Sequence, residues 1–454
     1  MNKLYTTLLI ACLAAGFTAC NDDDCEDLHL GNLAHYPNVL KGTFPTESQV
    51  LELGETLEIT PELLNPEGAT YSWLVNGKEY STEPTFSYKI DNPCRADLSC
   101  IIKNKYGKVE MSTSFSSNHN FSKGFFYVAD GTFNFYDTEK KTAYQDCYAS
   151  LNAGKTLGIG NYDSANIIHS NGKFYLLVGT STSNRDHFYI VDAKTLYYEN
   201  SAVVGANLSG VFVIKSLTIL NEQYGLVTGD GIRRIDLKSL NNVRIKNERL
   251  LCFYNSIIYN GKVLSNDTYK DESKVKYYDV NELIAAKEGE APAVTELDII
   301  QKQKINFVLA KDGNVYTLES ADNGCNIVKI KNDFTLEKVF ANFQPAKGPY
   351  HSSPTIGMVA SETENIIYLV STDGAIYKYI LGDSDSLKAP FIAAESGVSI
   401  TAPLQLNQQS GELYVTYTEE RKDESKIVVY SKDGKVLHTV DCGESVPSQI
   451  LFNN

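Results

Sequence analysis

From about residue 120 to its end, the chain repeats one short unit about seven times, and this repetition constrains the fold more than any other feature. In each copy a tight turn precedes a run of β-branched, aromatic or aliphatic residues, which is typical of a hairpin strand. The Asn-Gly and Asp-Gly pairs in these turns supply the positive φ angles that a two-residue hairpin requires. The turn and strand occupy residues 124–128, 171–178, 223–227, 260–264, 312–316, 364–370 and 410–415.

A further strand follows in every copy and often ends at an acidic residue. These strands are predicted at residues 133–137, 188–192, 232–236, 275–279, 327–330, 376–379 and 427–430. An aspartate at such a turn accepts backbone N–H bonds from the residues that follow it. We therefore interpret Asp137, Asp192, Asp236 and Asp279 as turn residues, not as catalytic acids.

The first copy lacks the opening strand that later copies have, for example at residues 165–168, 255–258 and 403–406. The last residues of the chain, 447–452, match that missing strand. A ring that closes in this way has no exposed sheet edges. The sequence therefore predicts a seven-bladed β-propeller over residues 120–454, closed by its C-terminal strand, and loss of folding on truncation after about Val446.

The N-terminal residues indicate export. Lys3 precedes an apolar run at 4–17 that is too short to cross a bilayer and is typical of a secretory signal at residues 1–19. Residues 17–20 resemble a lipobox, which predicts diacylation of Cys20, and an acidic linker follows at 20–35. Because residues 21–24 resemble an acidic export signal, we expect an outer-membrane lipoprotein that faces the cell exterior and contacts the membrane only through its lipid. A lipoprotein that faces the periplasm is the alternative.

Cysteine usage adds little to this interpretation. Of nine cysteines, Cys12 leaves with the signal and Cys20 takes the lipid, so an odd number remains. Cys94 and Cys100 could pair in an oxidising compartment, whereas we expect the propeller cysteines to be buried free thiols. No Cys or His spacing indicates a metal site.

Residues 36–117 are predicted to form a separate all-β unit. Residues 51–59 alternate apolar and polar side chains, as a half-buried strand does. The spacing of Tyr71, Trp73 and Gly77 resembles PKD-like and immunoglobulin-like sandwiches, with Trp73 in the core. A spacer role is expected, and ligand binding is the alternative.

Charge and motifs exclude several functions. The chain has 41 basic and 56 acidic residues, for a net charge of −15, which disfavours nucleic acid as a partner. Its seven histidines lack metalloprotease spacing, and no nucleophile elbow or phosphate-binding loop is present. We expect no catalysis, no metal and no cofactor.

Binding is better supported, because propeller loops converge at one end of the central channel while the blades hold them rigid. Predicted loops at this rim are rich in aromatic and hydrogen-bonding side chains, which suit a small amphipathic ligand. Ordinary polar turns are the alternative for each residue. The rim candidates are Tyr162, Arg185, His187, Tyr254, Asn255, Tyr269, Phe307, Tyr350, His351, Tyr417 and Arg421.

The lipobox, the acidic run, the strand patterns at 124–137 and 188–195 and the closing segment at 447–452 together resemble the YncE-like β-propeller lipoproteins of the bacterial surface. The resemblance implies capture of cobalamin or another corrinoid outside the cell and transfer to a TonB-dependent outer-membrane transporter. The chain departs from the family in its degenerate repeats and in the PKD-like module. A glycan-binding accessory lipoprotein and an adhesive propeller that binds another protein are the alternatives.

Overall fold

The structure is a computed structural model of the 454-residue chain. It describes residues 35–157, 164–179, 187–204, 216–228, 231–246, 256–266, 273–290, 292–301, 306–346, 357–419 and 424–453. The chain divides into two compact units, Met1–Asn118 and His119–Asn454. Within the described ranges, no helix combines the length and the apolar character that crossing a membrane requires.

The first unit is all β. A five-stranded sheet has the order β1-β7-β6-β3-β4, and β2 pairs with β5 in a second sheet. Side chains from both sheets share one hydrophobic core. The strands are β1 (Gln49–Glu52), β2 (Thr56–Ile59), β3 (Thr70–Val75), β4 (Lys78–Ser81), β5 (Phe86–Lys89), β6 (Arg95–Asn104) and β7 (Gly107–Asn118).

Trp73 lies at the centre of this core, as its sequence context predicts. Its side chain is 0% exposed, and its ring packs against Phe86 at a centroid distance of 5.2 Å. The indole Nε1–H donates to the backbone oxygen of Glu83 at 2.8 Å, so burial leaves no unpaired polar atom on the ring. Cys94 and Cys100, whose pairing the sequence left open, are both buried and are not joined in this structure.

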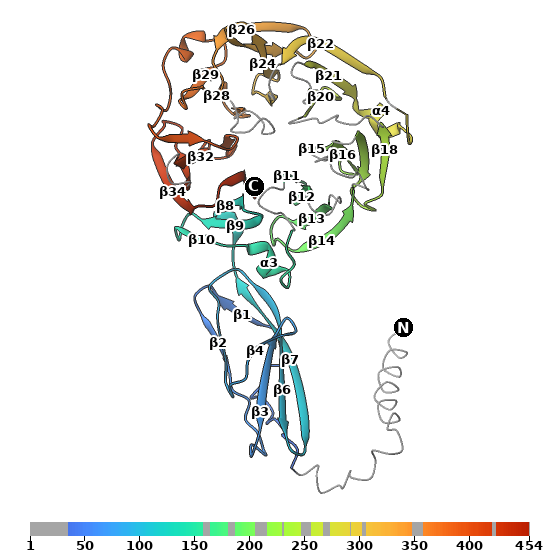
Figure 1. Ribbon diagram of the computed structural model, residues 1–454, viewed down its shortest axis with the longest axis vertical. Helices are drawn as coiled ribbons and strands as arrows, with labels where there is room; N and C mark the ends of the chain where they lie inside the picture. Colours follow the sequence, from blue (N-terminus) through green and yellow to red (C-terminus); the bar gives the residue numbers. More distant parts are fainter. Residues whose placement is uncertain are drawn as a thin grey trace. The chain divides into compact units, whose positions relative to one another are not determined.

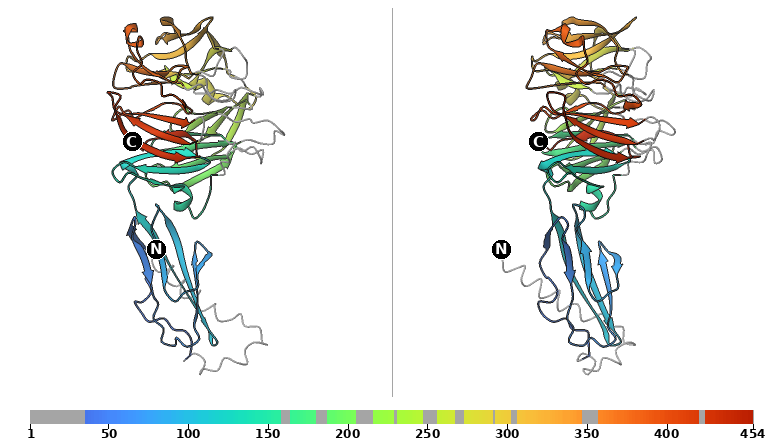
Figure 2. Two further views of the ribbon diagram at one scale, coloured as in Figure 1. Left: turned by 60° about the vertical axis from the view of Figure 1, so that its left-hand side comes forward. Right: turned by 90° about the vertical axis from the view of Figure 1, so that its left-hand side faces the viewer.

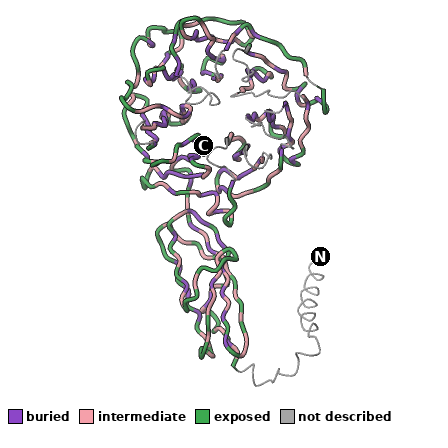
Figure 3. Tube along the Cα trace, viewed as in Figure 1, coloured by how far each residue is buried: buried purple, intermediate pink, exposed green. Residues whose placement is uncertain are grey.

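The second unit consists of small antiparallel sheets that follow one another around a ring, in a propeller-like arrangement (Figure 1). In Figure 2 the strands of each sheet run across the thickness of this ring. Buried residues concentrate within the sheets, and the outer perimeter of the ring is more exposed (Figure 3). Each hydrophobic cluster joins neighbouring sheets, as where Tyr175 and Phe188 pack with Leu217 and Val227.

The sheets are built from consecutive strands. The first half of the ring contains β8 (Gly124–Ala129), β9 (Thr132–Asp137), β10 (Thr142–Tyr144), β11 (Ser164–Ser170), β12 (Lys173–Gly179), β13 (His187–Asp192), β14 (Tyr198–Val203), β15 (Ser216–Ile219), β16 (Tyr224–Thr228), β17 (Ile232–Asp236) and β18 (Asn242–Lys246). Here β11 to β14 form one sheet and β15 to β18 the next.

The second half continues the pattern. Its strands are β19 (Ile257–Tyr259), β20 (Lys262–Asn266), β21 (Ser273–Asp279), β22 (Val294–Gln301), β23 (Val308–Leu309), β24 (Val315–Ala321), β25 (Gly324–Ile330), β26 (Leu336–Phe343), β27 (Met358–Ala360), β28 (Ile366–Val370), β29 (Ile376–Ile380), β30 (Val398–Ile400), β31 (Gln405–Leu406), β32 (Leu413–Glu419), β33 (Ser425–Tyr430), β34 (Val436–Gly443) and β35 (Pro447–Leu451). The sheets are β19–β22, β23–β26, β27–β29 and β30–β34.

The C-terminal strand completes the first sheet, as the sequence predicts. β35 pairs antiparallel with β8, and Ile450 lies opposite Tyr127. The resulting order is β10-β9-β8-β35, and Figure 1 shows the chain end beside β8. The first and last segments of the unit therefore share one sheet, which closes the ring.

The predicted turn chemistry is also confirmed. The Asp236 carboxylate accepts the backbone N–H groups of Lys238 and Ser239 at 3.0 and 2.7 Å. Asp137, Asp192 and Asp279 make the same pair of bonds to the residues two and three positions on. These aspartates therefore hold turns.

Residues 281–287 look helical in the sequence, and the structure has a short helix there, α4 (Val280–Ala285), capped by Asp279. The sequence did not predict α3 (Cys147–Leu151) or the 3₁₀ turns η2 (Phe121–Lys123) and η3 (Ser384–Leu387). α3 depends on Asp146, which adopts a left-handed conformation with φ 42° while its side chain accepts from the N–H of Ala149. So short a helix leaves no periodic pattern to recognise.

Candidate ligand-binding site

A cavity of about 760 Å³ lies against the first strands of three successive sheets, β11, β15 and β19. Glu362, from the turn between β27 and β28, lies on its wall as well. The described residues that line it are Ile168, His169, Ser170, Asn171, Leu217, Thr218, Ile219, Asn221, Glu222, Ser256, Ile257, Ile258 and Glu362. The site is thus assembled by the ring, from segments far apart in sequence.

Tight hairpins position these walls. Asn171 and Gly172 have φ angles of 51° and 68°, so the turn between β11 and β12 adopts the conformation that Asn-Gly favours. At the next hairpin, the Asn221 side chain accepts the N–H groups of Gln223 and Tyr224 at 2.9 and 2.8 Å. The turns are therefore fixed by local bonds and leave the adjoining first strands free to line the cavity.

The lining is amphipathic. Five side chains are branched aliphatics, and hydroxyl and amide groups stand between them. Glu222 and Glu362 are exposed carboxylates, and the described lining contains no Lys, Arg, Phe, Tyr or Trp. Such a surface suits an uncharged or cationic organic molecule that has both apolar faces and hydrogen-bonding groups.

His169 presents a neutral imidazole in this lining. Burial lowers the pKa of His169, because removal from water disfavours the charged form. Its ring lies 5.2 Å from that of Phe174 between centroids. The Nε2 atom is buried without a hydrogen-bond partner among the described residues, an exception to the usual pairing of buried polar atoms.

Side-chain amides bind the first strands of neighbouring sheets to one another. Gln449 donates to the backbone oxygen of Ile167 at 2.6 Å and accepts its N–H at 3.2 Å. Asn306 makes the same two bonds to Met358, at 2.6 and 2.9 Å. Each amide thus occupies both backbone groups of one residue at the inner edge of the next sheet.

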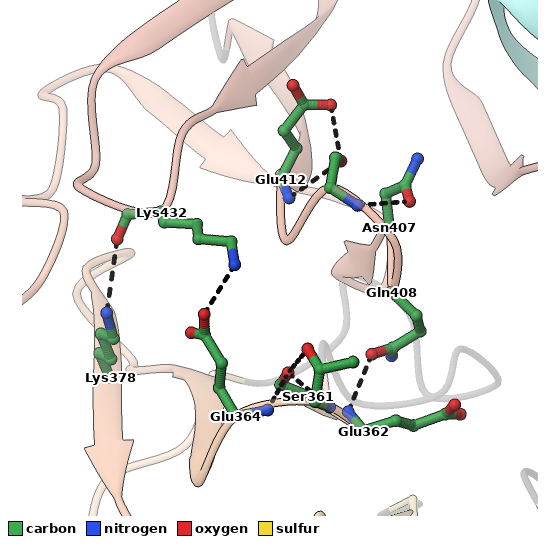
Figure 4. A network of polar contacts seen from close by, with 10 residues as sticks. Ser361, Glu362, Glu364, Lys378, Asn407, Gln408, Glu412 and Lys432 are labelled. Atoms are coloured by element: carbon green, nitrogen blue, oxygen red, sulfur yellow. Dashed lines mark hydrogen bonds and ion pairs between the residues drawn. The ribbon is translucent and has the colours of Figure 1, made fainter.

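A third amide, Gln408, spans two residues of an inner edge. It donates to the oxygen of Ala360 at 2.9 Å. It also accepts the N–H of Glu362 at 2.9 Å (Figure 4). The ion pair between Lys432 and Glu364, at 2.7 Å, lies in the same network. We call Gln449, Asn306 and Gln408 the amide clamps.

Of the predicted rim residues, three belong to the described part of the chain, and none of them lines the cavity. His187 begins β13, and its ring stacks on Tyr189. Phe307 and Tyr417 are each 5% exposed, and the Tyr417 hydroxyl bonds that of Tyr430 at 3.0 Å. The structure gives Phe307 and Tyr417 a packing role in the core, and contact of these three residues with a ligand stays a prediction.

The other predicted site residues lie outside the described residues. They are Cys20, Tyr162, Arg185, Tyr254, Asn255, Tyr269, Tyr350, His351 and Arg421.

The cavity itself was not predicted from the sequence. The predicted rim loops are the links into the first strands and the turns between second and third strands, whereas the cavity is lined by first strands and the turns that follow them. A usable signal was the Asn171-Gly172 pair, which places Ser170 and His169 at the end of an inner strand.

Two further observations bear on ligands. No group of three or more His, Cys, Asp or Glu side chains in the described ranges is arranged to hold a metal ion. The first unit has a hollow of about 420 Å³ lined by Thr46, Ser48, Asp97, Ser112, Thr113 and Ser114. Two of its hydroxyls already bond within the unit, Thr113 to the oxygen of Glu47 and Ser114 to Ser48.

The chain was compared with known proteins. A crystal structure of a quinonprotein alcohol dehydrogenase-like protein from Bacteroides thetaiotaomicron is 98% identical, covers 93% of this chain and 100% of that chain, and has a TM-score of 0.89. Virginiamycin B lyase from Staphylococcus aureus is 13% identical over 62% of this chain and 83% of its own, with a TM-score of 0.34. The Dos1 propeller is 10% identical over 71% and 85%, with a TM-score of 0.42.

No curated protein matches the chain. A PKD-like domain matches residues 37–104. The family described as "Domain of unknown function (DUF5074)" matches residues 121–453, which is the ring of sheets that carries the cavity. The chain therefore belongs to the DUF5074 family and has a PKD-like domain before its propeller-like unit.

Proposed function

We propose that this protein is a binding protein, not an enzyme, and that its propeller captures a small amphipathic nutrient in the cavity on β11, β15 and β19. The cavity carries the proposal. Its volume of about 760 Å³ lies within the range of sites for small organic ligands, roughly 300–1,000 Å³. Its mixed lining of aliphatic side chains, hydroxyls and amides suits a ligand with apolar faces and polar groups.

The ring is proposed to have seven blades. The succession of sheets from β8 to β34, together with the strand that the chain end adds to the first of them, supports this number. A closed ring of rigid sheets holds the cavity walls in place before the ligand arrives. Pre-formed walls lower the entropy lost on binding.

A corrinoid is the nutrient that we propose first, because the sequence resembles the YncE-like surface propellers. Its ring is a broad apolar surface with polar groups around the rim, which corresponds to the amphipathic lining. Transfer to a TonB-dependent transporter is part of the same proposal. The proposal also includes attachment to the outside of the outer membrane through a lipid on Cys20. This part rests on the sequence of residues 1–24.

The 98% identical protein is named a quinonprotein alcohol dehydrogenase-like protein. Enzymes of that kind hold a quinone cofactor, so the residues that line the cavity are compared with what a quinone requires. A flat quinone ring is expected to stack on aromatic side chains. The described lining has none, and its two charged groups are carboxylates, Glu222 and Glu362. These residues do not fit a bound quinone.

Calorimetric titration of the soluble protein, beginning after Cys25, with cyanocobalamin tests the proposal. We expect saturable binding at one site per chain. Ile219→Trp would fill the cavity from β15 and should weaken binding at least about tenfold, since a tenfold change corresponds to only 1.4 kcal/mol. Val203→Trp is the matched control, because Val203 is 44% exposed on β14, the fourth strand of its sheet.

Binding that survives Ile219→Trp would show that the ligand lies elsewhere. No heat with cyanocobalamin would exclude this corrinoid as the ligand. Retention on a polysaccharide gel would then favour a glycan ligand, and co-purification with an outer-membrane barrel alone would favour a protein partner.

A further inference from the structure

The first strand of each sheet in the ring forms backbone hydrogen bonds along one edge, to the second strand of the same sheet. Its other edge faces away from that sheet. In an antiparallel pair, residues alternate between those bonded to the partner strand and those that point away. On β11, Ser170 lies opposite Lys173 across a two-residue turn, so Ile167 and His169 have outward-facing backbone groups. The two bonds from Gln449 to Ile167 agree with this assignment.

The same rule identifies the outward-facing residues of β15. Leu220 N–H donates to the Tyr224 oxygen of β16 at 2.8 Å, so Leu220 and Thr218 face β16. Leu217 and Ile219 consequently present their N–H and C=O groups away from the sheet. Both residues line the cavity.

On β19 the outward-facing residue is Ile258. Tyr259 lies opposite Lys262 across the Asn260-Gly261 turn, so the pair that closes the turn is bonded and Ile258 points away. Ile258 also lines the cavity. In the described parts of the chain, no backbone or side-chain group bonds the outward N–H and C=O of Leu217, Ile219 or Ile258.

The amide clamps show which chemical group fits such an edge. Gln449 and Asn306 each bring one primary amide to one outward-facing residue, where the NH₂ donates to its C=O and the amide oxygen accepts its N–H. A primary amide has this donor and acceptor side by side. A carboxylate or an ester has no donor, so neither can satisfy both backbone groups.

We propose that the inner edges of β15 and β19 are a docking site for a ligand that carries primary carboxamide groups. Each carboxamide pairs with both backbone groups of Leu217, Ile219 or Ile258, as Gln449 pairs with Ile167. The inference rests on the proposed function, since it uses the same cavity, and it adds the ligand's chemical class. Glu222 and Glu362 at the same cavity disfavour ligands that carry carboxylates instead.

Two neutral corrinoids test the proposal directly. Dicyanocobinamide carries primary carboxamides around its ring, and the methyl ester of dicyanocobyrinic acid carries esters in their place. Because both sets of side groups are uncharged, repulsion by the two glutamates does not separate them. We expect the ester to bind at least about tenfold more weakly, because each lost pair leaves a buried N–H or C=O without a partner.

A proline substitution removes one outward N–H from the protein. Ile258→Pro should reduce the preference for carboxamide over ester, because proline lacks a donor and is tolerated where the N–H points away from the sheet. Ile258→Val keeps the N–H and is the control. Thermal unfolding of both variants checks that they are folded, and if Ile258→Pro does not fold, the comparison of the two corrinoids stands alone.

A second ligand pair separates this inference from corrinoid capture. N-acetylated triglutamine amide offers primary carboxamides without a corrin ring, and the corresponding peptide with γ-methyl esters is its control. Binding of triglutamine but of neither corrinoid would support the docking edges and overturn corrinoid capture. Equal affinity for the amide and ester corrinoids would contradict carboxamide docking at the inner edges of β15 and β19, but it would remain consistent with corrinoid capture. Absence of binding by all four ligands would overturn both.

Discussion

The side-chain amide of Gln449 bonds both backbone groups of Ile167, although the two residues are 282 positions apart in sequence. Gln449 lies on β35, which completes the sheet of β8, whereas Ile167 lies on β11 of the next sheet. The C-terminal strand therefore joins two sheets: by backbone pairing to the first and by one amide to the second.

Replacing Gln449 with alanine should destabilise the ring. The change leaves the N–H and C=O of Ile167 without their protein partner, which costs roughly 1–3 kcal/mol for buried groups. Urea denaturation followed by fluorescence should show a lower midpoint. Gln409→Ala is the matched control, because the Gln409 side chain is exposed and makes no hydrogen bond among the described residues. Equal midpoints for the two variants would contradict the role of the clamp.

Truncation after Val446 should prevent stable folding of the second unit. It removes β35 and exposes the edge of β8, whose Phe126 and Tyr127 lie opposite Leu451 and Ile450. An exposed hydrophobic strand edge promotes aggregation. Size-exclusion chromatography should find the truncated chain in aggregates. A soluble monomer with a native melting temperature would show that closure is dispensable.

Asp236 should contribute stability that depends on pH. The backbone N–H of Ser239, with the Gln223 side chain and the N–H of Lys238, lowers the pKa of Asp236. A carboxyl with a lower pKa in the folded state stabilises above its unfolded pKa of about 3.9, and this contribution disappears as the pH falls through the folded pKa. Because Asp236 is partly exposed at a surface turn, we expect less than about 1 kcal/mol.

Asp236→Ala should therefore lower the melting temperature at pH 7 more than at pH 3. The control is Asp433→Ala, since the exposed Asp433 carboxylate accepts no hydrogen bond from the described residues. A melting temperature for Asp236→Ala that is depressed equally at both pH values would indicate that packing, not the charged turn, is lost.

The described cysteines should resist alkylation in the native protein. Burial raises the pKa of Cys100 and of Cys442 to about 12 and that of Cys325 to about 11, so few thiolates exist at pH 8. Iodoacetamide at pH 8, followed by peptide mass spectrometry, should label these residues only after denaturation. Failure of Cys94 and Cys100 to react in unreduced, denatured protein would reveal a disulfide between them.

Local sequence was enough to predict the strands and turns of the ring. Asn171-Gly172 and Asn260-Gly261 require positive φ angles that few other residue pairs adopt. Asp236 and Asp279 hold their turns through bonds to residues two and three positions away. Even the closing strand was predictable, because one copy of the repeat lacked a strand and the chain end supplied a matching one.

The cavity could not be predicted in this way. His169, Leu217, Ile258 and Glu362 come from separate copies of the repeat, and nothing local distinguishes them from other strand residues. Likewise, Phe307 was assigned to a link into a first strand and Tyr417 to a turn between second and third strands, but both side chains are buried.

The hairpins, the acidic turns, Trp73 in the core of the first unit and the pairing of the chain end with β8 all follow from local patterns in the sequence. The packing of the sheets, in contrast, sets which outward-facing strand edges surround a cavity and which are occupied by Gln449, Asn306 or Gln408. Turn and strand preferences act between residues a few positions apart, whereas β11, β15 and β19 belong to three different sheets and come together only when those sheets pack side by side.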